Sequence, residues 1–149
     1  MTAEEMAHAC AAAMWADDQA SQRLGMELTD VGPGRATVTF TVSEAMVNGH
    51  GLCHGGYIFT LADSAFAFAC NSHNRIAVAQ HNTITYVAPG KLGDRLTAVA
   101  KEIALFGRSG ICDVRVSDQN GKLIAEFRGA SRTIEGRHFE EEAAGEAVS

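Results

Sequence analysis

One segment constrains the fold of this chain more than any other, the apolar run from Tyr57 to Cys70. Within the run a single side chain is charged, that of Asp63. A helix that is apolar on nearly all sides cannot lie on a protein surface, because much of its hydrophobic area would then contact water. We therefore expect a long helix over residues 55–71 that the rest of the chain surrounds.

The sequence on either side of this helix predicts strands. From Arg35 to Val42, apolar residues alternate with threonines at the period of two that is typical of a strand. Four further strand-like runs follow the helix, at residues 76–87, 95–105, 110–117 and 123–133, and turns rich in Gly, Pro and Asn separate them. Consecutive strands joined by short turns favour an antiparallel sheet with one face to cover. We therefore predict an α+β hotdog fold, a curled antiparallel sheet wrapped around a long central helix.

The chain of 149 residues suits a single domain. Residues 3–23 are rich in alanine, with Glu4 and Glu5 early and Arg23 late, which is the charge distribution that a helix dipole favours. We place the domain at residues 1–135, with this N-terminal helix included. The remaining residues, 136–149, are acidic and polar, and we expect them to form a disordered tail.

Charge and cysteine content exclude several classes of protein. The net charge is −6 and no basic stripe is present, so we expect no nucleic-acid partner. The four cysteines lack CxxC spacing, which favours a reducing compartment over a disulfide framework. The N-terminus lacks the basic segment of a signal peptide, and no apolar run approaches the roughly 20 residues that span a bilayer. We expect a cytoplasmic protein without a membrane partner.

A loop rich in glycine and histidine precedes the apolar helix and runs from Asn48 to Gly56. Gly55 and Gly56 have no side chains, so a ligand can approach the backbone closely at the helix start. Free amides at a helix N-terminus polarise a carbonyl and stabilise a developing oxyanion. The same glycines could instead make a tight turn under the sheet, and the local sequence leaves both interpretations open.

Asp63 is the second candidate for chemistry. An ionised carboxylate in apolar surroundings costs several kcal/mol unless it is paired or used, and the same surroundings raise its pKa. Asp63 follows Gly55 by eight positions, which is about 12 Å along a helix. If both groups act on one carbonyl, Asp63 of one chain must therefore face Gly55 of another. The alternative is that Asp63 bonds to a nearby hydroxyl, such as that of Thr60 or Ser64.

Other groups near the loop allow weaker hypotheses. His50 and His54 have the i, i+4 spacing of a metal pair on a helix, but the glycines around them disfavour a helix and no third ligand is evident. Cys53 beside these histidines is a conceivable nucleophile. Phe59, Phe66 and Tyr86 could line a pocket or simply fill the core.

A second glycine-rich turn lies later in the chain, Gly107-Arg108-Ser109-Gly110, between two predicted strands. It could present a cation and backbone amides to a phosphate. A hairpin turn with a solvated arginine is an equally good interpretation of these residues.

The string from Asn48 to Gly56, with His54-Gly55-Gly56 at its end, and the following Phe59-x-Leu61-Ala62-Asp63 resemble the PaaI-type hotdog acyl-CoA thioesterases. The later motifs Pro89-Gly90-x-x-Gly93-Asp94 and Phe127-Arg128-Gly129 also resemble this family. The resemblance covers roughly residues 5–135, and the spacing of His-Gly-Gly to Asp is specific among hotdog proteins.

The resemblance implies hydrolysis of an acyl-CoA to the free acid and CoA, with phenylacetyl-CoA or a ring-hydroxylated relative as the expected substrate. It implies that Asp63 is the general base or nucleophile, that the Gly55 N–H polarises the thioester carbonyl, and that His54 and Asn48 shape the site. It also implies that no metal or other cofactor is needed, and that the active sites form across a dimer interface, commonly within a homotetramer.

Relatives in this family often carry an arginine just before the Pro-Gly turn that helps to hold CoA, whereas this chain has Ala88. We expect Lys91, Arg108 and Ser109, together with Gly56 at the helix start, to contact CoA instead, and Arg95 is a further source of positive charge. Two other functions on the same fold remain alternatives. One is an enoyl-CoA hydratase or dehydratase that pairs His54 with Asp63, and the other is an acyl-CoA-binding domain without enzyme activity.

Overall fold

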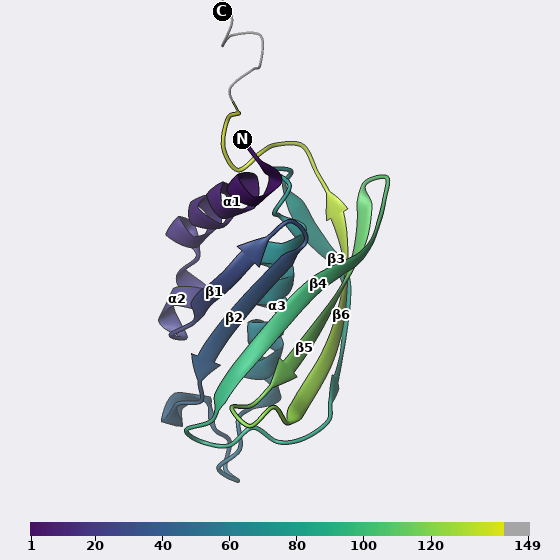
Figure 1. Cartoon of the computed structure of the whole chain (residues 1–149). Helices are drawn as coiled ribbons and strands as arrows, with labels where there is room; N and C mark the ends of the chain where they lie inside the picture. Colours follow the sequence, from purple (N-terminus) through teal and green to yellow (C-terminus); the bar gives the residue numbers. More distant parts are fainter. Residues whose placement is uncertain (142–149) are drawn as a thin grey trace, which may run out of the picture.

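The computed structural model describes residues 1–141, and Figure 1 labels its helices and strands. In chain order these are α1 (Ala3–Asp17), α2 (Gln19–Arg23), β1 (Glu27–Gly32), β2 (Arg35–Thr41), the 3-10 helix η1 (Glu44–Met46), α3 (Gly55–Cys70), β3 (Ala77–Tyr86), β4 (Arg95–Phe106), β5 (Ser109–Ser117) and β6 (Leu123–Thr133). The five strands and the long helix expected from the sequence are all present, with each end within one residue of its predicted position.

The sheet confirms the predicted fold class. Its six strands are all antiparallel and lie in the order β1-β2-β4-β5-β6-β3. Figure 1 shows the sheet curling around α3, which packs against strands from β2 through to β3. Strand β3 pairs with β6 alone within residues 1–141, so it forms an open edge of the sheet. This edge later positions the candidate site.

The apolar residues of α3 form the centre of the core. Leu61, Ala65 and Ala69 are fully buried, as the all-round hydrophobicity of the segment predicted. Phe66 lies against Phe127 and over the backbone of Gly129, where an added Cβ would come within 2.7 Å of the Phe66 ring. Each large apolar side chain buried in this way contributes about 1.5–3 kcal/mol to stability. Phe66 is therefore a core residue and not a pocket wall.

The N-terminal region differs from the prediction in two ways. The helix expected over residues 3–23 is broken at Asp18, whose carboxylate accepts hydrogen bonds from the backbone and hydroxyl of Ser21 and so caps α2. Strand β1 was missed, because Glu27, Thr29 and Asp30 are exposed on an edge strand and interrupt any apolar alternation.

The start of the predicted tail is also different in the structure. The buried side chain of Asn74 bonds to the backbone of His138 and Phe139, and His138 Nε2 lies 2.8 Å from Asn71 Oδ1. Residues 138–139 are therefore held against the turn after α3, because these asparagines need partners once they are buried. The rest of the predicted tail, residues 142–149, lies outside the described residues.

Among residues 1–141, no helix is both long enough and apolar enough to span a membrane.

Candidate active site

The first part of the candidate site is the N-terminus of α3, where the backbone is capped by a histidine. His54 Nδ1 accepts a hydrogen bond of 2.9 Å from the Gly56 N–H, and the His54 carbonyl accepts from the Tyr57 N–H at 3.0 Å. Within residues 1–141 the Gly55 N–H donates to no acceptor. An unbonded amide at a helix N-terminus is a ready donor to a carbonyl oxygen.

Asn48 shapes the loop that leads to this helix start. Its side-chain oxygen accepts hydrogen bonds from the backbone of His50 and Leu52, at 2.9 and 3.3 Å. The Cys53 N–H donates to the Gly90 carbonyl, which ties the loop to the Pro-Gly turn after β3. Asn48 therefore acts on the site by folding the loop, while the imidazole of His54 caps the helix.

Asp63 lies on the side of α3 that faces the edge strand β3. The Asn82 side-chain amide donates to the Asp63 carboxylate at 3.4 Å, a long bond, and burial raises the pKa of Asp63. The hydroxyls that offered an alternative partner bond elsewhere: Thr60 to the Gly56 carbonyl at 2.8 Å and Ser64 to Ser21 at 2.9 Å. The Asp63 carboxylate thus keeps most of its capacity to accept protons and hydrogen bonds.

Strand β3 runs past both halves of the candidate site. Tyr86 Oη donates to the Gly55 carbonyl at 2.9 Å, and four positions earlier on the same face Asn82 contacts Asp63. Four residues of strand span about 13 Å, which agrees with the separation of about 12 Å along the helix. Within one chain the two groups therefore stand at two separate points along β3.

Asn82 was not identified from the sequence, and Tyr86 was identified only as an aromatic residue of the pocket or the core. Asn82 and Tyr86 reach the site from an edge strand whose position depends on strand order. The sequence did contain a weak indication of Asn82. Asn82, Ile84 and Tyr86 lie on the same face of the strand, and a polar Asn at an inward position needs a hydrogen-bond partner. Asn82 Oδ1 is buried and has no hydrogen-bond partner among the described residues.

The cysteine and metal hypotheses receive no support from the geometry. Burial raises the pKa of the Cys53 thiol to about 11, so the thiolate needed for attack is scarce at neutral pH. Within residues 1–141, no cluster of three or more His, Cys, Asp or Glu side chains is arranged to hold a metal ion. His50 is exposed on the loop.

The expected CoA-binding residues fall into two groups at opposite ends of α3. Lys91 pairs with Leu52 beside the Gly/His loop, near Gly56. Arg108 and Ser109 occupy the tight β4–β5 turn, which projects past the C-terminal end of α3 (Figure 1). There Arg108 and Arg75 line a cavity of about 340 Å³. Arg95 instead bonds to Thr41 and Glu27.

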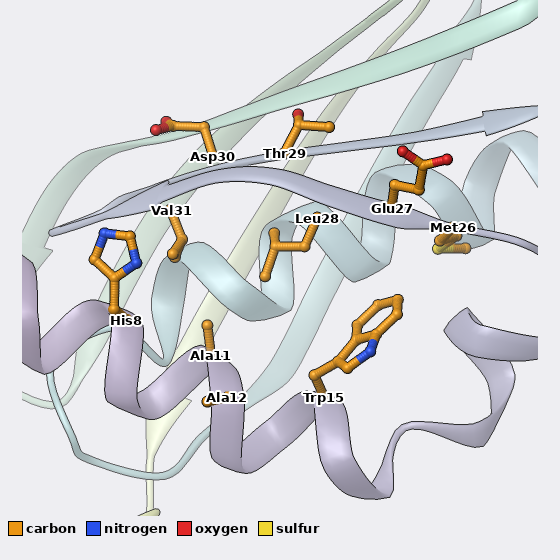
Figure 2. A pocket seen from close by; sticks show the side chains of 10 residues that line it. All are labelled: His8, Ala11, Ala12, Trp15, Met26, Glu27, Leu28, Thr29, Asp30 and Val31. Carbon is orange, nitrogen blue, oxygen red and sulfur yellow. The ribbon is translucent and has the colours of Figure 1, made fainter.

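A larger groove of about 570 Å³ lies between α1 and β1. Figure 2 shows Trp15 on α1 and Leu28 and Val31 on β1 pointing into it, while Thr29 and Asp30 point away. Because β1 and β3 are opposite edges of the sheet, this groove is separate from Gly55 and Asp63.

Comparisons with known proteins relate this geometry to a family. The model of the thioesterase superfamily matches residues 50–125. The acyl-coenzyme A thioesterase PaaI of Escherichia coli is 44% identical over 124 residues, which cover 83% of this chain and 89% of that protein. The solved structure of the E. coli PaaI protein from the phenylacetic acid degradation operon matches with a TM-score of 0.90 at 41% identity, over 91% of this chain and 99% of that one.

More distant structures share the same core. A mutant of the phenylacetic acid degradation protein PaaI from Thermus thermophilus matches at 36% identity with a TM-score of 0.76, over 78% of this chain and all of that one (100%). A hypothetical thioesterase from Streptococcus pneumoniae, solved with coenzyme A, matches at 27% identity with a TM-score of 0.72, over 75% of this chain and 90% of that one.

Proposed function

The chain belongs to the thioesterase superfamily and is a hydrolase of thioester bonds, and from this premise we propose that it cleaves phenylacetyl-CoA or a ring-hydroxylated phenylacetyl-CoA. Two observations carry the proposal: the unbonded amide of Gly55 and the desolvated carboxylate of Asp63, in residues that contact two separate points along strand β3. E. coli PaaI, matched both in sequence and in structure, is named as an acyl-coenzyme A thioesterase and as a protein of the phenylacetic acid degradation operon, which supports the substrate class.

The proposed reaction is a hydrolysis at the thioester carbonyl. The Gly55 N–H donates to the carbonyl oxygen, and Asp63 removes a proton from a water molecule as that water attacks the carbonyl carbon. The tetrahedral intermediate carries its negative charge on the oxygen at Gly55. When it collapses, the C–S bond breaks, and the CoA thiolate takes up the proton that Asp63 removed from water, which leaves the free acid, CoA and the regenerated carboxylate.

Asn82 contributes to this reaction by its contact with the Asp63 carboxylate. Its buried Oδ1 lacks a partner among the described residues, and its amide already points to the Asp63 carboxylate. Because Oδ1 is shielded from solvent, the amide is the part of Asn82 that can act here, and we propose that it orients the Asp63 carboxylate as the base for water. Direct attack by Asp63 is the alternative route, in which Asp63 would form a mixed anhydride with the acyl group.

A dimer built on strand β3 would complete the site. In an antiparallel pair of β3 strands with Ile84 on the two-fold axis, Asn82 of one chain lies opposite the partner's Tyr86. Residues that face each other in such a pair point to the same side of the sheet. Asp63 of one chain would then face the partner's Gly55, and the open edge of β3 supports this arrangement. A homotetramer of two such dimers remains part of the proposal.

The same dimer geometry would bring the residues that we expect to bind CoA close to one another. Arg108 and Ser109 lie beyond Asp63 on the side away from Gly55 of the same chain. The partner's Gly/His loop, with Lys91 beside it, would occupy that side as well. Lys91 and Arg108 could then bind the phosphates of one CoA, with Ser109 and the helix start at Gly56 nearby. Since the Gly56 N–H is bonded to His54, we assign that glycine a role in access only.

The proposal requires no metal or further cofactor, because a carboxylate and a backbone amide suffice for the chemistry. A cytoplasmic location belongs to the same proposal, and the four cysteines, all buried as free thiols, support a reducing compartment. The matched family and relatives are thioesterases, so the hydratase and the non-enzymatic alternatives are not favoured.

The test is release of free thiol from phenylacetyl-CoA by the wild-type chain and by Asp63→Asn and Asp63→Ala. Removing a catalytic carboxylate of this kind is expected to lower kcat by about 10²–10⁴-fold. Asp17→Asn is the matched control, since Asp17 is exposed at the end of α1, and it is expected to retain full activity. Near-wild-type turnover in both Asp63 variants, with the fold intact, would reject the proposal.

A further inference from the structure

Tyr86 makes two separate contacts with Gly55, the residue proposed to polarise the thioester. Its hydroxyl donates to the Gly55 carbonyl at 2.9 Å. Its ring also occupies the space beside the Gly55 Cα, so that a Cβ added there would lie 2.9 Å from Tyr86 Cζ and 3.2 Å from Cε1. The side chain is half exposed, with an exposed fraction of 49%, so it is not held in place by the core.

These contacts fix the orientation of the backbone on one side of Gly55. The peptide between Gly55 and Gly56 is held at both ends, by Tyr86 at its carbonyl and by His54 Nδ1 at its N–H. The preceding peptide is held at the His54 carbonyl by the Tyr57 N–H. With both flanking peptides fixed in this way, the Gly55 N–H has one direction available to it.

Backbone conformation does not explain why position 55 is a glycine. Gly51, in the same loop, has a φ of +74° and open space around it, so it is a glycine for conformational reasons. Gly55 is not among the glycines with positive φ, and any residue could adopt its backbone conformation. A side chain at position 55 would instead meet the ring of Tyr86, which would have to leave its present position.

We propose that Tyr86 is a positioning residue for the carbonyl-polarising amide, and that glycine occupies position 55 because a larger residue there would displace the Tyr86 ring from Gly55. This inference rests on the proposed function. It assigns to Tyr86 an effect on the transition state, where the bond from Gly55 to the oxyanion is strongest, and little effect on ground-state binding of the acyl-CoA.

The first experiment compares Tyr86→Phe with Tyr57→Phe, which removes the same phenolic hydroxyl from a nearby side chain whose ring lies edge-on to that of His54. Tyr57 Oη makes no hydrogen bond within residues 1–141. Tyr86→Phe is expected to lower kcat by about 10-fold while KM changes by less than about 2-fold, and Tyr57→Phe should match the wild type. Equal kcat values for Tyr86→Phe and the wild type would overturn the assignment.

The second experiment is a double-mutant cycle. Gly55→Ala alone is expected to lower kcat by about 100-fold, because the methyl group and the Tyr86 ring cannot both keep their positions. In a Tyr86→Ala background the same change should cost less than about 3-fold, since the space is then free. An equal loss in both backgrounds would show that Tyr86 is not the reason for the glycine.

Thermal melts and size-exclusion chromatography of each variant separate this effect from a loss of fold or assembly. A merely structural role for Tyr86 would lower Tm without the split between kcat and KM. If the wild type releases no thiol from phenylacetyl-CoA, both the proposed function and the inference about Tyr86 fail. If the wild type is active, but Tyr86→Phe has the wild-type kcat and Gly55→Ala costs the same in both backgrounds of the cycle, the inference alone fails.

Discussion

The carboxylate of Asp63 occupies a helix that offers it little solvation. Its neighbours on the same helix, Thr60 and Ser64, use their hydroxyls elsewhere, and the contact with Asn82 is long. Desolvation therefore raises the pKa of Asp63. A desolvated carboxylate of this kind lowers the stability of the fold and is more reactive as a base, which is the usual relation between stability and activity at a catalytic residue.

This relation predicts an effect of pH on stability. A raised carboxyl pKa means that the folded state binds the proton more tightly than the unfolded state does. The free energy of unfolding therefore falls as pH rises from the ordinary Asp pKa through the folded one, and the full penalty is present above the folded pKa. Asp63→Asn should raise Tm at pH 7, and the gain should disappear below about pH 4.

The measurement is thermal unfolding of the wild type and Asp63→Asn from pH 3.5 to 8. Asp17→Asn again provides the control, and it should show no such pH-dependent gain. A gain from Asp63→Asn that was largest in acid would have the opposite sign and would contradict the desolvated carboxylate.

The β4–β5 hairpin extends beyond the end of the helix that it covers, and its turn therefore lies outside the core. Its turn carries Arg108 past the end of α3, at the opposite end of the molecule from the Gly/His loop (Figure 1). Arg108 shares a cavity with Arg75, and the described residues contain no salt bridge to either guanidinium. Arg137 and the carboxylate of Glu135 also line this cavity, so its lining carries a net positive charge, which suits a ligand with phosphates.

The hairpin therefore predicts a dependence on the nucleotide end of the substrate. Arg108→Ala should raise KM for phenylacetyl-CoA by about 10-fold, the value of one charge-assisted contact. The same variant should hydrolyse the phenylacetyl thioester of N-acetylcysteamine, which lacks the phosphates, as well as the wild type does. Arg115→Ala, which removes an arginine paired with Glu126 on the exposed face, serves as the matched control. An equal loss on both thioesters would place Arg108 outside the CoA site.

For the whole molecule, the central prediction concerns how many chains make one site. If Asp63 and Gly55 act across a dimer, the inactive variants Asp63→Asn and Gly55→Ala should complement each other. A mixed dimer has one site with both native groups and one with neither. After subunit exchange of equal amounts, about half of the dimers are mixed, so activity should return to about a quarter of the wild-type value.

Native mass spectrometry of the same mixture measures the fraction of mixed dimers. Activity that stayed at the level of the separate variants, despite proven exchange, would contradict the shared site. Absence of recovery is the result expected if each chain carries both groups of its own site, because each variant chain then lacks one of them.

The sequence by itself determined the local structure and the chemical candidates. The alternation of β2 and the all-round hydrophobicity of α3 are properties of neighbouring residues, so their ends were predicted to within one residue. Asp63 stood out because burying a charge is costly wherever the helix lies. The separation of Gly55 and Asp63 followed from the rise of a helix alone.

The tertiary structure decided which distant residues meet. Asn82 and Tyr86 reach Asp63 and Gly55 because β3 pairs with β6 at the edge of the sheet, not with its neighbours in the chain. Strand β1 and the contacts of residues 138–139 with Asn71 and Asn74 likewise depend on partners elsewhere in the chain. Such contacts join segments that local patterning treats independently, so only the order of the strands and the packing of the helix could reveal them.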